Sequence, residues 1–254
     1  SFIDFYSDFD DALEKARELL AGTHEPGDIL EWSLPFGFPG AFLYDGILKR
    51  QFSPVVKLDD PKLELYAAEA IQCLYAADGL LRSREFKLVV MSHAINFNFA
   101  SIAWRAAQLG IPAIVLFAMH GRSRFWRINT PPDIFDQYSR PYPSDLDSLS
   151  PEKAEALANI GKEYMDQRLK GELGDMGSFY AYRKPRDTIS RNDIATYFGW
   201  DSKRPIIAVY SPNWFDFPHV VGMSQFRDYL DWILVTYELA RETKQVNWIF
   251  KPHP

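Results

Sequence analysis

The chain has 254 residues, which is enough for one large domain or two modest ones. Its apolar fraction of 47% and aromatic fraction of 15% are typical of a globular protein with a sizeable core. The net charge of -6 argues against nucleic acid as the main partner, because contact with a phosphate backbone requires clustered positive charge.

One cysteine and five histidines limit the chemistry that the chain can carry. Cys73 lies within a helical pattern, so we interpret it as a buried apolar residue and expect no disulfide framework and no cysteine-based metal site. The histidines have no tight metal-ligand spacing, so we expect no metal. The longest apolar stretch, residues 111–119, is shorter than the roughly 20 residues that span a bilayer. These features fit a reducing cytoplasm.

The first part of the chain predicts a βαβ unit. Apolar residues at helical spacing predict helices over residues 11–21, 61–77 and 100–109. Asp78-Gly79 then indicates the end of the second helix, while the Gly-, Pro- and aromatic-rich residues 32–54 predict a loop. Two β-rich runs, residues 87–91 and 112–117, predict buried strands on either side of the third helix. Strand, helix and strand would therefore form a unit with parallel strands.

The second part predicts another such unit. Residues 129–150 are rich in Pro and Asp and indicate a long surface connection. Ser150 and Ser190 then read as N-caps of two helices. The second βαβ unit is predicted from a strand at 205–210, a loop at 211–223, a helix at 224–243 and a strand at 246–250. We expect two α/β domains, residues 1–186 and 187–254.

Polar residues follow both predicted strands of the second unit. A parallel crossover would place these residues at one edge of the sheet, where ligands bind. After the last strand, Lys251 offers a point charge and His253 a switchable donor, which suits a phosphate. In the other loop, Asn213 and His219 can donate hydrogen bonds and Asp216 can orient a histidine. The alternatives are an ordinary strand exit and a turn aspartate. Because a terminal strand has nothing after it to cover it, we expect the chain to be cut there.

The first unit offers candidates for catalysis and acceptor binding. His93 follows a predicted strand, where a catalytic group would lie in an open sheet, although a structural histidine is the alternative. Asp45 could accept a proton from an acceptor hydroxyl or could be an ordinary turn residue. Three arginines that alternate with aromatic residues would clamp an anionic sugar or phosphate, unless they form a solvated loop. These are Arg122, Arg124 and Arg127.

Four segments resemble bacterial capsule and surface-polysaccharide biosynthesis proteins with a GT-B glycosyltransferase fold. They are GAFLYDGILKR, LVVMSHAINFNFASIAWRAAQLGIPAIVLF, SPNWFDFPH and VNWIFKPHP, in this order. The last is similar to the His-Pro motif of bacterial sialyltransferases, Kdo transferases and glycerophosphotransferases, whose histidine contacts the donor phosphate. The resemblance gives His253 that role. One departure concerns Asp45, since Tyr44 stands where sialyltransferases have the first acidic residue of their base motif.

The resemblance implies two Rossmann-like parallel-sheet domains that face a cleft, the second of them truncated in this chain. It implies metal-independent transfer of a sugar, without a cofactor, from a cytidine- or uridine-type nucleotide donor to a glycan or glycolipid acceptor. Asp45 or His93 would be the base. The alternatives are a CDP-polyol phosphotransferase of teichoic-acid type and a non-catalytic nucleotide- or carbohydrate-binding protein. A cytoplasmic location, with peripheral association at the inner face of the membrane, would follow.

Overall fold

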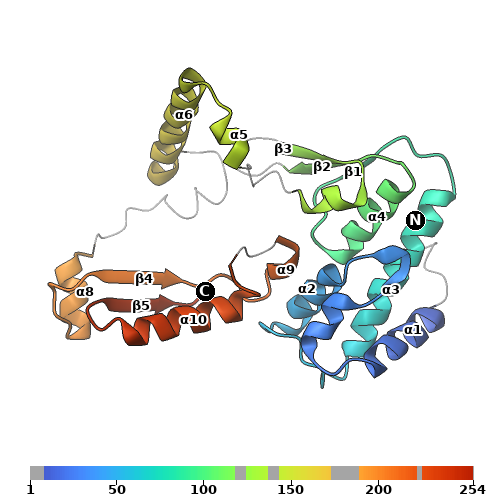
Figure 1. Ribbon diagram of the computed structural model, residues 1–254, viewed down its shortest axis with the longest axis horizontal. Helices are drawn as coiled ribbons and strands as arrows, with labels where there is room; N and C mark the ends of the chain where they lie inside the picture. Colours follow the sequence, from blue (N-terminus) through green and yellow to red (C-terminus); the bar gives the residue numbers. More distant parts are fainter. Residues whose placement is uncertain (1–8, 118–123, 137–142, 173–188, 222–224, 254) are drawn as a thin grey trace.

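A computed structural model describes residues 9–117, 124–136, 143–172, 189–221 and 225–253 (Figure 1). The helices are α1 (Phe9–Ala21), α2 (Gly40–Gln51), α3 (Leu63–Arg82), α4 (Phe97–Gln108), α5 (Pro143–Asp147), α6 (Pro151–Lys170), α8 (Arg191–Phe198), α9 (Pro218–Val221) and α10 (Tyr229–Glu242). Short 3-10 helices are η2 (Pro26–Glu31), η3 (Pro35–Gly37) and η4 (Pro131–Phe135). The strands are β1 (Val89–Met91), β2 (Ala113–Phe117), β3 (Arg124–Ile128), β4 (Ile206–Tyr210) and β5 (Asn247–Lys251).

The predicted α/β class and both βαβ units are confirmed. Strands β1 and β2 pair in parallel on either side of α4 in the sequence, and β4 and β5 pair in parallel on either side of α10. In Figure 1 the two sheets lie in different parts of the molecule. The register pairs Tyr210 with Lys251, so the two strands of the second unit end side by side, as the crossover rule predicts.

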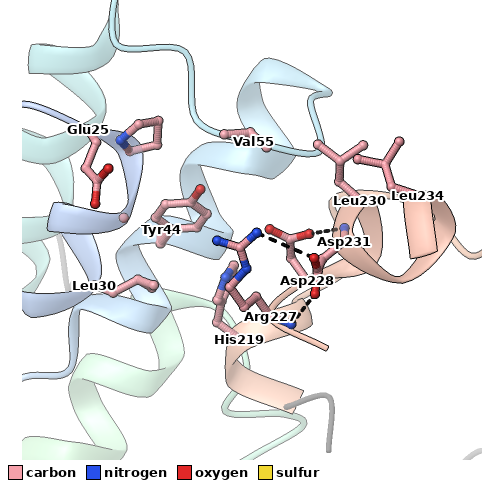
Figure 2. Close-up of a pocket in the computed structure, with 12 residues that line it drawn as sticks. Glu25, Leu30, Tyr44, Val55, His219, Arg227, Asp228, Leu230, Asp231 and Leu234 are labelled. Atoms are coloured by element: carbon pink, nitrogen blue, oxygen red, sulfur yellow. Dashed lines mark hydrogen bonds and ion pairs between the residues drawn. The ribbon is translucent and has the colours of Figure 1, made fainter. Parts of the chain in front are cut away.

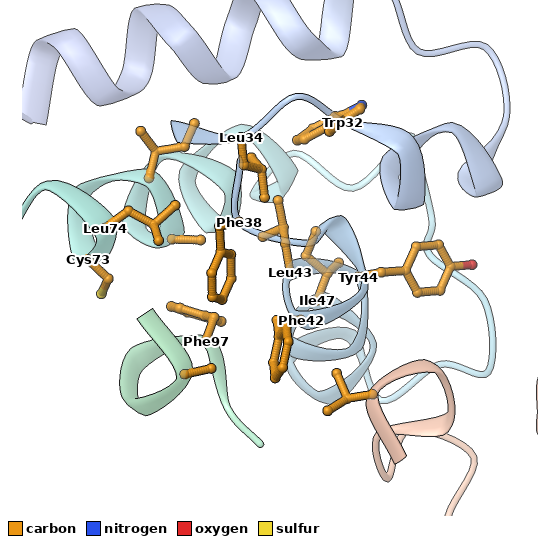
Figure 3. Packing of buried hydrophobic residues seen from close by; sticks show 14 of the residues in the cluster. Trp32, Leu34, Phe38, Phe42, Leu43, Tyr44, Ile47, Cys73, Leu74 and Phe97 are labelled. Carbon is orange, nitrogen blue, oxygen red and sulfur yellow. The ribbon is translucent and has the colours of Figure 1, made fainter. Parts of the chain in front are cut away.

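Most of the core lies among α1, α2, α3 and α4. Figure 3 shows Phe42 and Ile47 of α2 packed near Phe38, Leu74 and Phe97, all of them buried. The many alanines of α3 give it a narrow surface, which lets α1 and α4 pack closely against it. Cys73 lies in this helix and is 3% exposed, which confirms its interpretation as a core residue.

The loop predicted over residues 32–54 is wrong for its second half, which is the buried helix α2. Its glycines permit close packing instead of a loop. A Cβ on Gly40 would lie 2.2 Å from the carbonyl oxygen of Ile29, and one on Gly46 would lie 2.6 Å from Cδ1 of Phe97. Glycine in this helix therefore marks where another segment approaches its backbone.

Three other sequence-based boundaries are also corrected. Helix α3 continues through Asp78 to its last turn, because Asp78 accepts hydrogen bonds from Nε of Arg82 (2.9 Å) and of Arg105 (2.6 Å). The basic segment predicted as a loop includes β3, which pairs antiparallel with β2. The predicted connection over 129–150 contains η4 and α5. Within the described ranges, none of the helices has both the length and the apolar character to cross a membrane.

Candidate functional site

Asp45 of α2 lies against the start of α9 and has no exposed surface. Its Oδ2 accepts hydrogen bonds from the backbone N–H groups of His219 (3.0 Å) and Val220 (2.8 Å). Its Oδ1 lies 2.6 Å from Nδ1 of His219. Amides in the first turn of a helix have no partner within the helix, and Pro218 opens this one. Asp45 therefore acts as an external cap for α9 and orients the His219 ring.

The burial of Asp45 and its hydrogen bonds with His219 and Val220 determine how the Asp45–His219 pair is protonated. Burial raises the pKa of Asp45 above its ordinary value of 3.8, while the hydrogen bonds from His219 and Val220 oppose the rise. With Oδ2 already accepting two amides, the geometry fits an ionised Asp45 to which Nδ1–H of His219 donates. In that tautomer Nε2 of His219 has a free lone pair and can accept a proton.

His219 lines a cavity of about 290 Å³ between the amino-terminal helices and α10 (Figure 2). The apolar part of its wall includes Leu30, Leu230 and Leu234. The remaining lining residues are Glu25, Pro26, Gly27, Tyr44, Val55, Arg227, Asp228 and Asp231. The His219 side chain is 12% exposed, so most of the ring is enclosed while part of it is accessible. The cavity therefore gives a small molecule access to a histidine that a buried carboxylate orients.

Tyr44, the residue before Asp45, supports the histidine from a second side. The two ring centroids of Tyr44 and His219 are 4.6 Å apart, with an interplanar angle of 66°. The Tyr44 hydroxyl accepts a hydrogen bond from the backbone N–H of Val56 at 3.5 Å. Burial raises the pKa of Tyr44, and the nearby Asp228 carboxylate adds to the rise, so the hydroxyl keeps its proton at neutral pH.

Aromatic contacts hold the segment before α9 against the end of α2. Phe217 is 2% exposed, and Nζ of Lys49 lies 4.8 Å from the centre of its ring. Phe215 packs edge-on against Phe52 at 5.2 Å between ring centroids. Phe217 also has a φ of 55°, in the left-handed region that few residues with a side chain adopt. The position of His219 therefore depends on this packing as well as on Asp45.

The other four predicted donor-site residues do not line the cavity. Lys251 is at the sheet edge, where its carbonyl accepts a hydrogen bond from the Ser211 backbone N–H (3.1 Å). His253 follows it and is exposed. Asp216 is exposed, and its N–H donates to the carbonyl of half-buried Asn213 at 3.2 Å, as in a turn. The two strand exits are thus adjacent as predicted, while His219, which contacts Asp45, is the predicted donor-site residue that lines the cavity.

The first-unit candidates are dispersed. His93 is half-buried, with Nδ1 2.9 Å from the Ser92 hydroxyl and its ring 4.6 Å from that of Phe99, and it does not line the cavity. Arg127 is exposed on β3. Arg124 begins the same strand, whereas Arg122 lies outside the described residues. Of these three arginines, Arg127 is the one whose side chain the structure describes, and it does not line the His219 cavity.

Sequence reasoning missed the acidic wall of the cavity. Asp228 caps α10 by accepting a hydrogen bond from the Asp231 N–H (2.7 Å), and Asp231 pairs with Arg227 at 3.4 Å. An aspartate three residues before another acidic residue is a readable helix-start signal. It gives the helix boundary but does not show that Glu25, from a distant part of the sequence, lies on the same cavity.

Among the described residues, no group of three or more His, Cys, Asp or Glu side chains is arranged to hold a metal ion. Comparison of the chain with protein families, with curated proteins and with solved structures gave no match. The function is therefore argued from the geometry of the Asp45–His219 pair and its cavity.

Proposed function

We propose that the chain belongs to a GT-B-type glycosyltransferase in which His219 is the general base and Asp45 positions it. The observation that carries this proposal is the buried carboxylate 2.6 Å from Nδ1 of a histidine that lines a cavity. Asp45 or His93 is the base expected from the sequence, but the Asp45 side chain has no exposed surface and His93 does not line the cavity. The proton-accepting role therefore passes to Nε2 of His219.

In the proposed reaction an acceptor hydroxyl enters the cavity and loses its proton to Nε2 of His219. The hydroxyl oxygen attacks the anomeric carbon of the donor sugar, and the bond from that carbon to the nucleotide phosphate breaks. The electron pair of that bond leaves with the phosphate. Asp45 stabilises the imidazolium that forms, in the way that a buried carboxylate supports the histidine of a hydrolase triad.

The donor phosphate is assigned to the paired strand exits of the second unit. Lys251 lies where β5 ends, next to the end of β4, and His253 follows it. Positive charge at this edge would offset the charge that grows on the leaving phosphate. Support for the GT-B arrangement comes from the two separate sheets and from the cavity between α2 and α10. The four sequence segments support the family assignment.

The test begins with nucleotide binding and continues with turnover. Thermal shifts with CMP, CDP, UDP and GDP identify the preferred base, since a ligand that binds only the folded protein stabilises it by mass action. The matching nucleotide sugar is then supplied with glycan acceptors, and the product is weighed by mass spectrometry. A transferred polyol phosphate instead of a sugar would favour the teichoic-acid-type alternative. Binding without turnover would favour the non-catalytic one.

His219→Gln should lower kcat by roughly a hundredfold to ten-thousandfold, the range that a general base contributes. The nucleotide-induced thermal shift should stay as in the parent protein, because His219 is placed on the acceptor side. His24→Gln is the matched control, since His24 is exposed and does not line the cavity. Parent-level turnover in His219→Gln would contradict the base role.

A further inference from the structure

The charged side chains that line the cavity indicate which charge a bound ligand would carry. Among the described residues, three carboxylates line it, those of Glu25, Asp228 and Asp231, against the single guanidinium of Arg227. That guanidinium is already paired with Asp231 at 3.4 Å, and its side chain is 87% exposed. The Asp45 carboxylate lies directly behind His219. A nucleotide diphosphate or an acidic sugar would meet net repulsion here, whereas a cation would be attracted.

The two aspartates of the cavity are held in place by the local structure. Asp228 is fixed by its capping bond to the Asp231 N–H, and in Figure 2 it lies with Asp231 on the side of the cavity that faces Tyr44 and His219. Burial raises the pKa of the Tyr44 hydroxyl, and the negative charge of Asp228 raises it further. A ligand amine in the cavity would therefore lie between fixed carboxylates and the histidine.

The size and the apolar wall limit the ligand further. A volume of about 290 Å³ is just below the range of roughly 300–1,000 Å³ that is typical of small-molecule sites. This favours a single ring over a whole nucleotide sugar. Leu30, Leu230 and Leu234 offer an apolar surface for the C–H face of such a ring, opposite polar groups that can bind its hydroxyls.

We infer that the cavity beside His219 is an acceptor subsite that selects an amine-bearing sugar ring and discriminates against an acidic one. The role of this subsite as an acceptor site rests on the proposed function. Its charge preference is a binding property that can be measured without turnover. Glu25 and Asp228 are the specificity-determining residues, because Asp231 is neutralised by its partner Arg227.

The experiment uses three probes that differ in charge: methyl glucosaminide, methyl glucoside and methyl glucuronide. Binding is followed by NMR through the ring signals of His219, assigned by their loss in His219→Gln. The glucosaminide should bind most tightly, the glucoside less tightly, and the glucuronide should show no saturable effect. A glucuronide that binds as tightly as the glucosaminide overturns the inference.

Asp228→Asn should weaken glucosaminide binding about twofold to fivefold, the effect of one partly exposed charge pair, and leave glucoside affinity nearly unchanged. Asparagine caps a helix as well as aspartate does, so α10 should stay intact. Glu25→Gln should act in the same direction. Glu31→Gln is the control: it makes the same charge change as Glu25→Gln, at the far end of the 3-10 helix that Glu25 precedes, at an exposed position that does not line the cavity.

If neither Asp228→Asn nor Glu25→Gln changes the preference for the amine, the inference is wrong. The test of this charge preference can fail or succeed independently of the test of the proposed function. A charge preference without any sugar transfer contradicts the transferase alone. Sugar transfer with equal binding of the three probes contradicts the acceptor selectivity alone.

Discussion

A carboxylate without exposed surface needs partners for both oxygens, and Asp45 finds them at the start of α9. The amides of His219 and Val220 satisfy Oδ2, and the imidazole satisfies Oδ1. Loss of the side chain would leave three donors without an acceptor, at about 1–3 kcal/mol for each unsatisfied buried group. Asp45 thus has a structural role as well as the positioning role proposed for it.

Asp45→Asn separates those two roles. The asparagine oxygen can still accept the two amides, but its NH₂ group then faces Nδ1 of His219 and donates to it. The histidine must carry its proton on Nε2, where it cannot act as a base. We expect kcat to fall at least a hundredfold while nucleotide binding persists, as is typical of a lost general base. The ¹⁵N shifts of His219 report the tautomer, and an unchanged tautomer with reduced kcat would argue against positioning.

The pairing of Asp45 with His219 could not have been predicted from the sequence. The two residues are 174 positions apart, and both lie in short segments with several plausible local roles. The sequence singles out Asp45 as a carboxylate beside a glycine in an aromatic-rich segment, and His219 as a hydrogen-bond donor in the loop after a predicted strand. What brings them together is the docking of α9 on α2, a tertiary contact without a local signal.

At the scale of elements, the spacing of apolar residues predicted the helices and strands whose formation depends on local sequence. The two βαβ units and the adjacent ends of β4 and β5 follow from strand–helix–strand patterns and the crossover rule. Helix α2 was missed because Gly40 and Gly46 weaken its helical signal, although both permit close contacts. The end of α3 was misplaced because Asp78-Gly79 resembles a cap, whereas Asp78 pairs with arginines from two helices.

Gly46→Ala tests whether the glycine in α2 serves packing. Alanine favours a helix over glycine by about 1 kcal/mol, but the added Cβ would lie 2.6 Å from the Phe97 ring. Overpacking of this kind costs about 1–3 kcal/mol, so we expect a net loss in the free energy of unfolding. Gly161→Ala in α6 is the control, since nothing lies within 4 Å of its added Cβ, and it should cause no loss. Equal effects in denaturant titrations would contradict the packing role.

At the scale of the whole molecule, α9 joins the carboxyl-terminal unit to the helices of the amino-terminal part. Figure 1 shows α9 beside α2, with β4, β5 and α10 beyond it. The unit itself buries few side chains, among them Val209 and Asn247, so its position relative to α2 depends on the contacts of Phe217, His219 and Val220. The cavity spans the same junction, so its shape depends on this contact too.

Phe217→Ala should release α9 from α2 without unfolding the amino-terminal core. The ring is 2% exposed, and removing a buried phenylalanine ring costs about 3–5 kcal/mol. Since local opening and hydrogen exchange are linked, the His219 and Val220 amides should exchange roughly a hundredfold faster or more, while the α3 amides keep their protection. Phe52→Ala is the comparison: Phe52 packs on Phe215 at the same junction and has a similar φ of 48°, but it is 75% exposed, so its loss should accelerate the two amides far less. If Phe52→Ala accelerated the two amides as much, their protection would not depend on the buried ring, and the assignment of Phe217 as the anchor of the junction would be wrong.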